Sequence, residues 1–186
     1  LGGEVREVVY LKPDTISLSG DGSQDNPYVI ESHDSRDTVT SLSNNRLDSR
    51  DVEKITFVNA EPKAPENAHL SWDVSDAKNG SIIAYTLDDD NNGKYELYVV
   101  KKGKVYANKS SSSLFSFTNA LEVEGLENFS AKNVDLMWRY FSGLKSVVKL
   151  DLGGLDTSFA DNMTEMFAGC KCLVSLDVSG WDTSNV

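Results

Sequence analysis

Three polar residues with alternating spacing could form the first half of a calcium-binding loop. Asp88, Asp90 and Asn92 match positions 1, 3 and 5 of such a loop, and Gly93 matches position 6. A complete loop needs a bidentate glutamate at position 12, where this chain has Val99. Because the stretch is rich in turn-forming residues, it also suits a solvated hairpin tip. We therefore expect a plain turn, with weak calcium binding as the alternative and no other cofactor.

Other reactive residue types lack the partners that catalysis requires. The two histidines, His33 and His69, are too few for a histidine-based catalytic centre or a zinc cluster. The serine run 110–113 has no Gly-x-Ser-x-Gly elbow around it. Cys170 and Cys172 stand two residues apart, where side chains diverge, so we expect free thiols. We expect no enzymatic activity in these residues.

The composition is that of a globular chain with an acidic surface. Apolar residues make up 39% of the 186 positions and charged residues 25%. Eighteen basic against 29 acidic residues give a net charge of −11, which repels phosphate backbones and anionic lipids. No stretch approaches the roughly 18 apolar residues that span a bilayer. We therefore expect no nucleic-acid partner and no membrane insertion. Because the chain opens without Met, we interpret it as an internal fragment.

A 26-residue period runs through residues 114–186. Within one unit, the alternation of Leu150 and Leu152 predicts a short strand. Apolar residues at helical spacing over 163–173 predict a short helix. A coil of this size cannot bury its own apolar face, so neighbouring coils must stack. The clearest triplets are Phe115, Phe141 and Phe167; Leu121, Val147 and Leu173; and Phe129, Leu155 and Trp181.

The turn between strand and helix repeats as well. It reads Gly-Leu-Asp-Thr-Ser and then Gly-Trp-Asp-Thr-Ser, so Asp156 and Asp182 recur at the same place. Recurrence points to turn capping, because catalysis needs one asymmetric site. For Trp181 we expect an inward, core position.

The repeats carry a family resemblance. The stretch 150–186, LDLGGLDTSFADNMTEMFAGCKCLVSLDVSGWDTSNV, closely resembles the 26-residue leucine-rich repeats of bacterial BspA-like surface proteins. The Asp-Thr-Ser step followed by Met-x-x-Met-Phe and Cys is its most specific part. The match weakens in the first unit, where Ser130-Ala131-Lys132 replaces Asp-Thr-Ser. Residues 71–115 resemble the stretch that precedes these repeats in the same family. The resemblance implies a secreted or cell-surface bacterial protein.

Residues before the repeats are predicted to form strands. The runs 81–87 and 94–100 flank a turn-forming cluster, 102–108 supplies a third strand, and 52–60 enters the same region. An antiparallel sheet here would cover the open end of the first coil. The predicted fold is therefore α+β, a small antiparallel β cap followed by a short leucine-rich-repeat solenoid with strand, turn and short helix in each coil.

These predictions divide the chain into three domains. Residues 1–50 form an N-terminal β/linker extension, with strand-like runs at 7–11 and 26–31. Residues 51–113 form the β-rich N-terminal cap, and residues 114–186 form a truncated repeat array. Whether residues 1–31 are an independent domain is left open.

The predicted function is an adhesion or protein-binding module. A solenoid offers one extended concave surface, and the family resemblance implies contact with a host matrix protein, a bacterial surface protein or a glycan. The alternative is a non-binding spacer or stalk that presents another domain; an apolar patch above a few hundred Å² on the concave face would favour binding. The truncated last coil could also associate end to end with another copy. The expected ligand-binding residues are Lys149, Asp151, Gly153, Ser175, Asp177 and Ser179.

Overall fold

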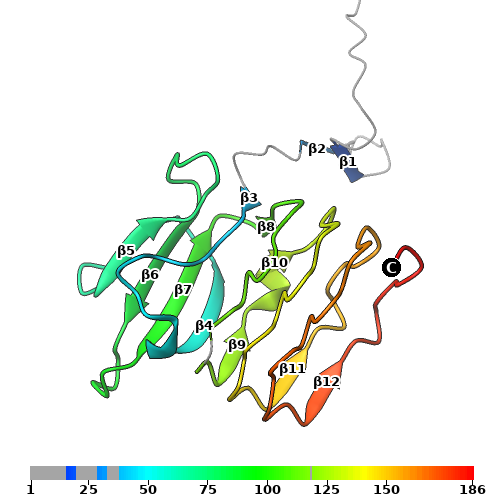
Figure 1. Ribbon diagram of the computed structural model, residues 1–186. Helices are drawn as coiled ribbons and strands as arrows, with labels where there is room; N and C mark the ends of the chain where they lie inside the picture. The colour runs from blue at the N-terminus through cyan, green and yellow to red at the C-terminus, as the bar shows by residue number, and fades with distance from the viewer. Residues whose placement is uncertain (1–15, 20–28, 33–37, 118) are drawn as a thin grey trace, which may run out of the picture. The chain divides into compact units, whose positions relative to one another are not determined.

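The computed structural model describes residues 16–19, 29–32, 38–117 and 119–186, and the chain divides into two units (Figure 1). In the unit Leu1–Asp34, strands β1 (Ile16–Ser19) and β2 (Val29–Ser32) pair antiparallel. The predicted strand at 7–11 and the first part of the one at 26–31 lie outside the described residues. The unit Ser35–Val186 contains the other elements that the structure describes.

A five-stranded sheet in the order β5-β6-β7-β4-β9 occupies one side of the second unit (Figure 1). Strands β5 (Leu70–Asp73), β6 (Ile83–Leu87) and β7 (Tyr95–Lys101) pair antiparallel in sequence order. Strand β4 (Val52–Asn59) runs parallel to β7 and to β9 (Glu122–Glu124). The predicted strands are present, but the sheet is mixed, so the purely antiparallel cap is wrong.

Two smaller sheets complete the described part of this unit. One has the order β10-β8-β3, all parallel, and the other pairs β11 with β12 in parallel. The run 102–108, predicted as a third strand of the cap sheet, contains β8 but belongs to the three-stranded sheet instead. The bounds are β3 Thr38–Val39, β8 Val105–Ala107, β10 Phe129–Ser130, β11 Lys149–Asp151, β12 Ser175–Asp177, and the 3-10 helices η2 Ser49–Asp51 and η3 Leu126–Asn128.

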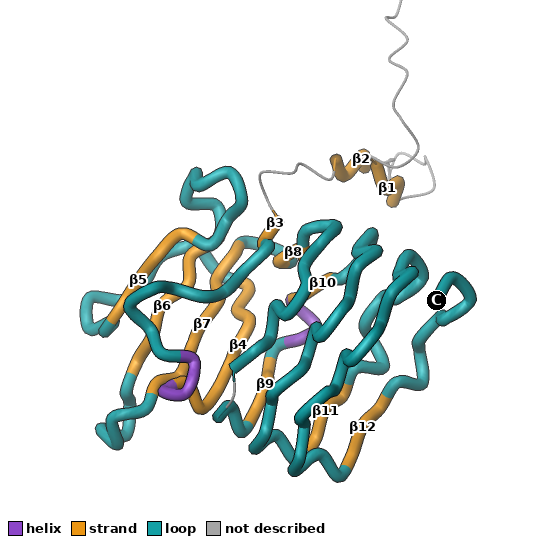
Figure 2. Tube along the Cα trace, in the orientation of Figure 1, coloured by secondary structure: helices purple, strands orange, loops and turns teal. Residues whose placement is uncertain are grey.

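The described residues contain no α-helix, and turns fill the places where the repeat predicted one (Figure 2). Short i to i−3 hydrogen bonds close these turns, as from the Met166 N–H to the Met163 oxygen at 3.2 Å. Left-handed backbone at Glu165 (φ 56°) and Gly169 (φ 79°) stops each turn from continuing as a helix. The predicted α+β solenoid of strand, turn and short helix is therefore wrong, and this unit is built from three sheets and connecting turns.

Backbone pairing between successive repeat units explains the missing helix. Alternate N–H groups over 137–143 donate to carbonyls of the following unit at 2.8–3.0 Å. A group that bonds to a neighbouring segment cannot also bond four residues back along its own chain. The donor–acceptor pairs are Met137–Asn162, Arg139–Thr164, Phe141–Met166 and Gly143–Ala168.

Aromatic rings spaced 26 residues apart stack in a row that begins in the core. The ring centroids of Phe115 and Phe141 lie 4.7 Å apart, and those of Phe141 and Phe167 lie 5.8 Å apart. Trp181 extends the row at 6.0 Å from Phe167 and donates its indole N–H to the Leu152 carbonyl at 2.9 Å. Trp181 packs against the core while remaining partly exposed. The repeat thus positions apolar side chains for burial.

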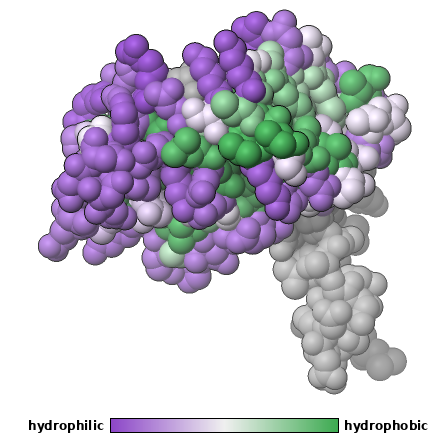
Figure 3. Space-filling model, turned by 90° about the horizontal axis from the view of Figure 1, so that it is seen from below, coloured by the Kyte–Doolittle hydropathy of each residue, from purple (hydrophilic) through white to green (hydrophobic). Residues whose placement is uncertain are grey.

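Exposed apolar side chains stand at the beginning of three parallel strands. Leu121, Val148 and Val174 immediately precede β9, β11 and β12, and Val174 is 85% exposed. The view from below shows hydrophobic residues gathered on this side of the molecule (Figure 3).

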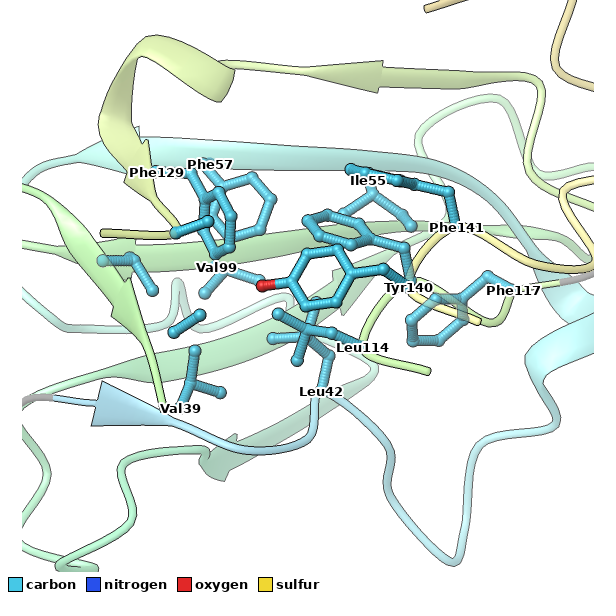
Figure 4. Close-up of a cluster of buried hydrophobic side chains, with 14 of the residues drawn as sticks. Val39, Leu42, Ile55, Phe57, Val99, Leu114, Phe117, Phe129, Tyr140 and Phe141 are labelled. Atoms are coloured by element: carbon cyan, nitrogen blue, oxygen red, sulfur yellow. The ribbon is translucent and has the colours of Figure 1, made fainter. Parts of the chain in front are cut away.

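Replacing Tyr140 by Phe is expected to stabilise the fold. Tyr140 is fully buried, and its hydroxyl has no hydrogen-bond partner among the described residues (Figure 4). Burial also raises the pKa of this phenol far above its usual range. Removing an unsatisfied buried hydroxyl should raise the free energy of unfolding by about 1 kcal/mol, measured by urea denaturation. Tyr95→Phe, at a partly exposed ring, is the control. A loss of stability in Tyr140→Phe would contradict the prediction.

Candidate functional site

Four of the predicted ligand-binding residues lie side by side on two paired strands. Lys149 stands opposite Ser175 and Asp151 opposite Asp177 in the parallel β11–β12 pair. All four side chains are exposed, whereas Leu150 between them is buried. Strand alternation therefore turns the polar set to solvent. We call the six predicted residues, Lys149, Asp151, Gly153, Ser175, Asp177 and Ser179, the strand face.

Hydrogen bonds after β12 hold part of the strand face in place. The Ser179 backbone N–H donates to Asp177 Oδ1 at 2.9 Å. This bond, the Ser179 hydroxyl and the nearby Lys149 charge together keep the pKa of Asp177 below its usual value. A Cβ at Gly153 would lie 3.2 Å from Ser179 Oγ and 3.3 Å from Asp177 Oδ1, so glycine permits close approach. Asp177 is thus a fixed, ionised group at neutral pH.

Strand β9 adds further acidic groups near β11. Lys54 Nζ on β4 lies 2.8 Å from Glu124 and 3.5 Å from Glu122. Hydrogen bonding to Glu124 is the main reason that the pKa of Lys54 is raised, against an opposing effect of burial. One lysine therefore faces two carboxylates, which leaves the exposed side of β9 acidic.

A pocket of about 340 Å³ opens between η3 and the residues that follow β11. Phe129, Leu152 and Leu155 contribute to its lining, although each of these residues is at most 7% exposed. Val123 and Leu126 add partly exposed apolar walls. The hollow beside the strand face therefore has a mixed lining of polar and apolar atoms.

Three charged residues belong to the lining of this pocket. Asp151 comes from the strand face, Glu127 from η3, and Lys104 from the turn before β8. Sequence reasoning selected Asp151 alone, because Lys104 and Glu127 lie outside the well-matched repeats. The sequence offered one signal for these residues. The first repeat unit, which contains Glu127, departs from the pattern of the later units.

The predicted calcium loop folds as a turn whose carboxylates accept hydrogen bonds from its own backbone. Asp88 Oδ1 accepts from the Asn92 N–H at 3.0 Å and Asp88 Oδ2 from the Gly93 N–H at 3.2 Å. Asp90 Oδ1 also accepts from the Asn92 N–H, at 3.1 Å. These bonds close the hairpin between β6 and β7 and occupy lone pairs that a cation would need.

The structure places Asp90 with two carboxylates that sequence reasoning missed. Oxygens of Asp90, Glu53 and Glu96 lie within 4.8 Å of one another. Glu53 lies on β4, so only the β4–β7 pairing brings it to the hairpin. The Asn92 amide bridges the cluster, donating to Asp90 at 2.9 Å and to Glu53 at 3.3 Å. With one oxygen from each residue, the three carboxylates supply three of the six to eight oxygens that calcium prefers.

Calcium is expected to leave the melting temperature nearly unchanged. Raising calcium to about 5 mM should shift it by less than about 1 °C, because the loop carboxylates bond to their own backbone and coordination is incomplete. Differential scanning fluorimetry with magnesium as the control ion measures this shift. A rise of several degrees with calcium alone that disappears in Asp90→Asn would contradict the expectation.

The recurring aspartates cap turns, as predicted. Asp156 Oδ1 accepts from the Ser158 N–H at 3.1 Å and from its hydroxyl at 2.7 Å. Asp182 Oδ1 accepts from the Ser184 N–H at 2.9 Å, and this bond lowers the pKa of Asp182. Neither carboxylate is therefore a candidate for catalysis.

Comparison with known families gives one match, and it covers the repeat region. Residues 109–186 match the family described as "Mycoplasma protein of unknown function, DUF285". This family is found in surface proteins of BspA type. The match therefore supports the resemblance to bacterial surface proteins in general, but not its finer details. The strand face and most of the pocket lie within the matched residues. No curated protein and no solved structure matches the chain.

The described residues include no helix of the length and apolar character that crossing a membrane requires.

Proposed function

We propose that this chain is part of a secreted or cell-surface bacterial protein and that its strand face binds a protein on another surface. The match of residues 109–186 to DUF285 supports the location. One observation carries the binding role: exposed charged side chains of β11 and β12 adjoin a pocket with a mixed polar and apolar lining, and Asp151 belongs to both. Rigid parallel strands hold these groups in fixed positions.

The alternative, a spacer that presents another domain, has its own support. The exposed side chains of β11 and β12 are almost all polar, and Leu176 is the exception at 39% exposed. Such strands suit a solvated stalk. The pocket beside the strand face, where charged and apolar groups meet, is what favours binding over this alternative.

A binding screen tests the proposal. The chain would be immobilised and exposed to host matrix proteins, bacterial surface proteins and glycans by biolayer interferometry. We expect saturable binding of a protein that falls at least about tenfold in Lys149→Gln/Asp151→Asn, because charge-assisted contacts contribute about 1.5–3 kcal/mol each. The matched control, Lys171→Gln/Asp161→Asn, changes two exposed charges outside the strand face.

Three outcomes of the screen oppose the proposal. Absence of any saturable ligand favours the spacer, and capture of glycans alone replaces the protein partner by a sugar. Equal loss in the control variant would show that the effect is not specific to the strand face. Because β12 has an open edge with Leu176 and Val178 exposed, the screen must include sedimentation at several concentrations. Concentration-dependent dimers would reveal end-to-end association.

A further inference from the structure

The pocket beside the strand face has the size of a site for one side chain. Its volume of about 340 Å³ lies at the lower end of the range for small-molecule pockets, about 300–1,000 Å³. Its lining is mixed, and the partly exposed Val123 and Leu126 supply apolar surface on which an alkyl chain could replace water. Gly125 and Gly154 also contribute to the lining.

The charges of the lining favour a cationic head group. Glu127 and Asp151 supply two carboxylates against the single ammonium group of Lys104. Neither carboxylate forms an ion pair with any residue in the described part of the chain. On neighbouring β9, Glu122 and Glu124 share Lys54, and the whole chain carries −11. The electrostatic potential at the pocket and that of the whole chain therefore attract cations.

An apolar stem with a cationic head is the chemistry of lysine and arginine side chains. Both bury their methylene groups along apolar surface while the charged end stays at a polar rim. Arginine has the further advantage of a planar fork that binds carboxylates through two parallel hydrogen bonds. The geometry points to a pocket that receives a lysine or arginine side chain presented by a partner protein, an inference that rests on the proposed binding function of the strand face.

Gly154 offers a way to close the pocket without disturbing the fold. A Cβ built at Gly154 meets no atom within 4 Å, and its φ is not in the left-handed region. A larger side chain therefore has room, and because Gly154 belongs to the lining we expect a bulky residue there to obstruct the pocket. Gly125 offers no such route, because a Cβ there would collide with the Phe57 backbone.

The test is a titration of the whole chain with amino acids whose amino and carboxyl groups are blocked, monitored by nuclear magnetic resonance. The probes are the N-acetyl amides of arginine, lysine, glutamine, leucine and glutamate. Arginine and lysine should shift the amide signals of Glu127 and Gly154 saturably, and the other three should not. Raised salt should weaken the binding, because a partly exposed ion pair is screened.

Two variants distinguish binding in the pocket from non-specific attraction to the acidic surface. Glu127→Gln/Asp151→Asn should weaken arginine binding at least about tenfold, and Gly154→Phe should abolish it. The matched control, Glu66→Gln/Asp161→Asn, makes the same change in net charge at exposed carboxylates outside the pocket and should bind normally. The circular dichroism spectrum of each variant verifies its fold.

The outcomes distinguish this inference from the proposed function. Failure of the arginine probe, equal shifts with leucine or glutamate, or normal binding in the double variant would each overturn it. A protein ligand from the screen that binds Gly154→Phe as tightly as the unaltered chain would overturn it while leaving the strand-face function in place. Arginine binding without any protein ligand would retain the pocket and reject the adhesion function.

Discussion

Phe115→Ala is expected to remove about 3–5 kcal/mol from the free energy of unfolding. Phe115 is fully buried and lies at the centre of an aromatic cluster, with ring centroids 4.7 Å from Phe141 and 5.4 Å from Phe129. Its ring centroid also lies 5.8 Å from that of Phe57 on β4. One side chain therefore joins the five-stranded sheet to the repeat units. Truncation would leave a cavity between elements that cannot collapse independently.

Urea denaturation followed by circular dichroism measures this loss as a lower midpoint at unchanged slope. Phe159→Ala is the matched control, because Phe159 is 55% exposed and its truncation should change stability by no more than about 0.5 kcal/mol. Since small domains are stable by only about 5–15 kcal/mol, Phe115→Ala could halve the total. A loss below about 1 kcal/mol would show that the cluster is not a shared core.

Gly125→Ala is expected to cost about 2–4 kcal/mol through two separate effects. Gly125 has a left-handed backbone (φ 70°), which side chains disfavour. A Cβ there would also lie 2.1 Å from the Phe57 carbonyl oxygen, a backbone atom held within β4. Either β4 or the start of η3 would have to move. The glycine thus permits the close contact between the repeat region and the sheet.

Gly154→Ala is the control for this prediction, because its Cβ meets nothing within 4 Å and its backbone is not left-handed. It should leave stability unchanged or raise it by up to about 1 kcal/mol, since alanine lowers the entropy of the unfolded chain. Thermal unfolding of both variants under one set of conditions gives the comparison. Equal melting temperatures would mean that β4 and η3 adjust freely, contrary to the expectation.

The sequence by itself determined which aromatic side chains form the repeating row and which turns are capped. Periodicity over 114–186 marked Phe115, Phe141 and Phe167, which stack in the core at 26-residue spacing. Asp156 and Asp182 were identifiable as caps because a carboxylate two residues before a serine satisfies backbone N–H groups locally. The strands of the β6–β7 hairpin were predictable for the same reason, because turn-forming residues and the alternation of apolar and polar side chains act over a few residues.

Only the tertiary structure decided which elements form and which distant groups meet. Helical spacing at 163–173 predicted a helix, but the backbone there bonds to the preceding unit, and pairing between units outweighs local periodicity. The parallel placement of β4 brings Glu53 to Asp90 and Phe57 to Gly125, contacts that no local pattern contains. The pocket joins Lys104 and Glu127 to Asp151 for the same reason: long-range packing sets its shape, and packing depends on all neighbours at once.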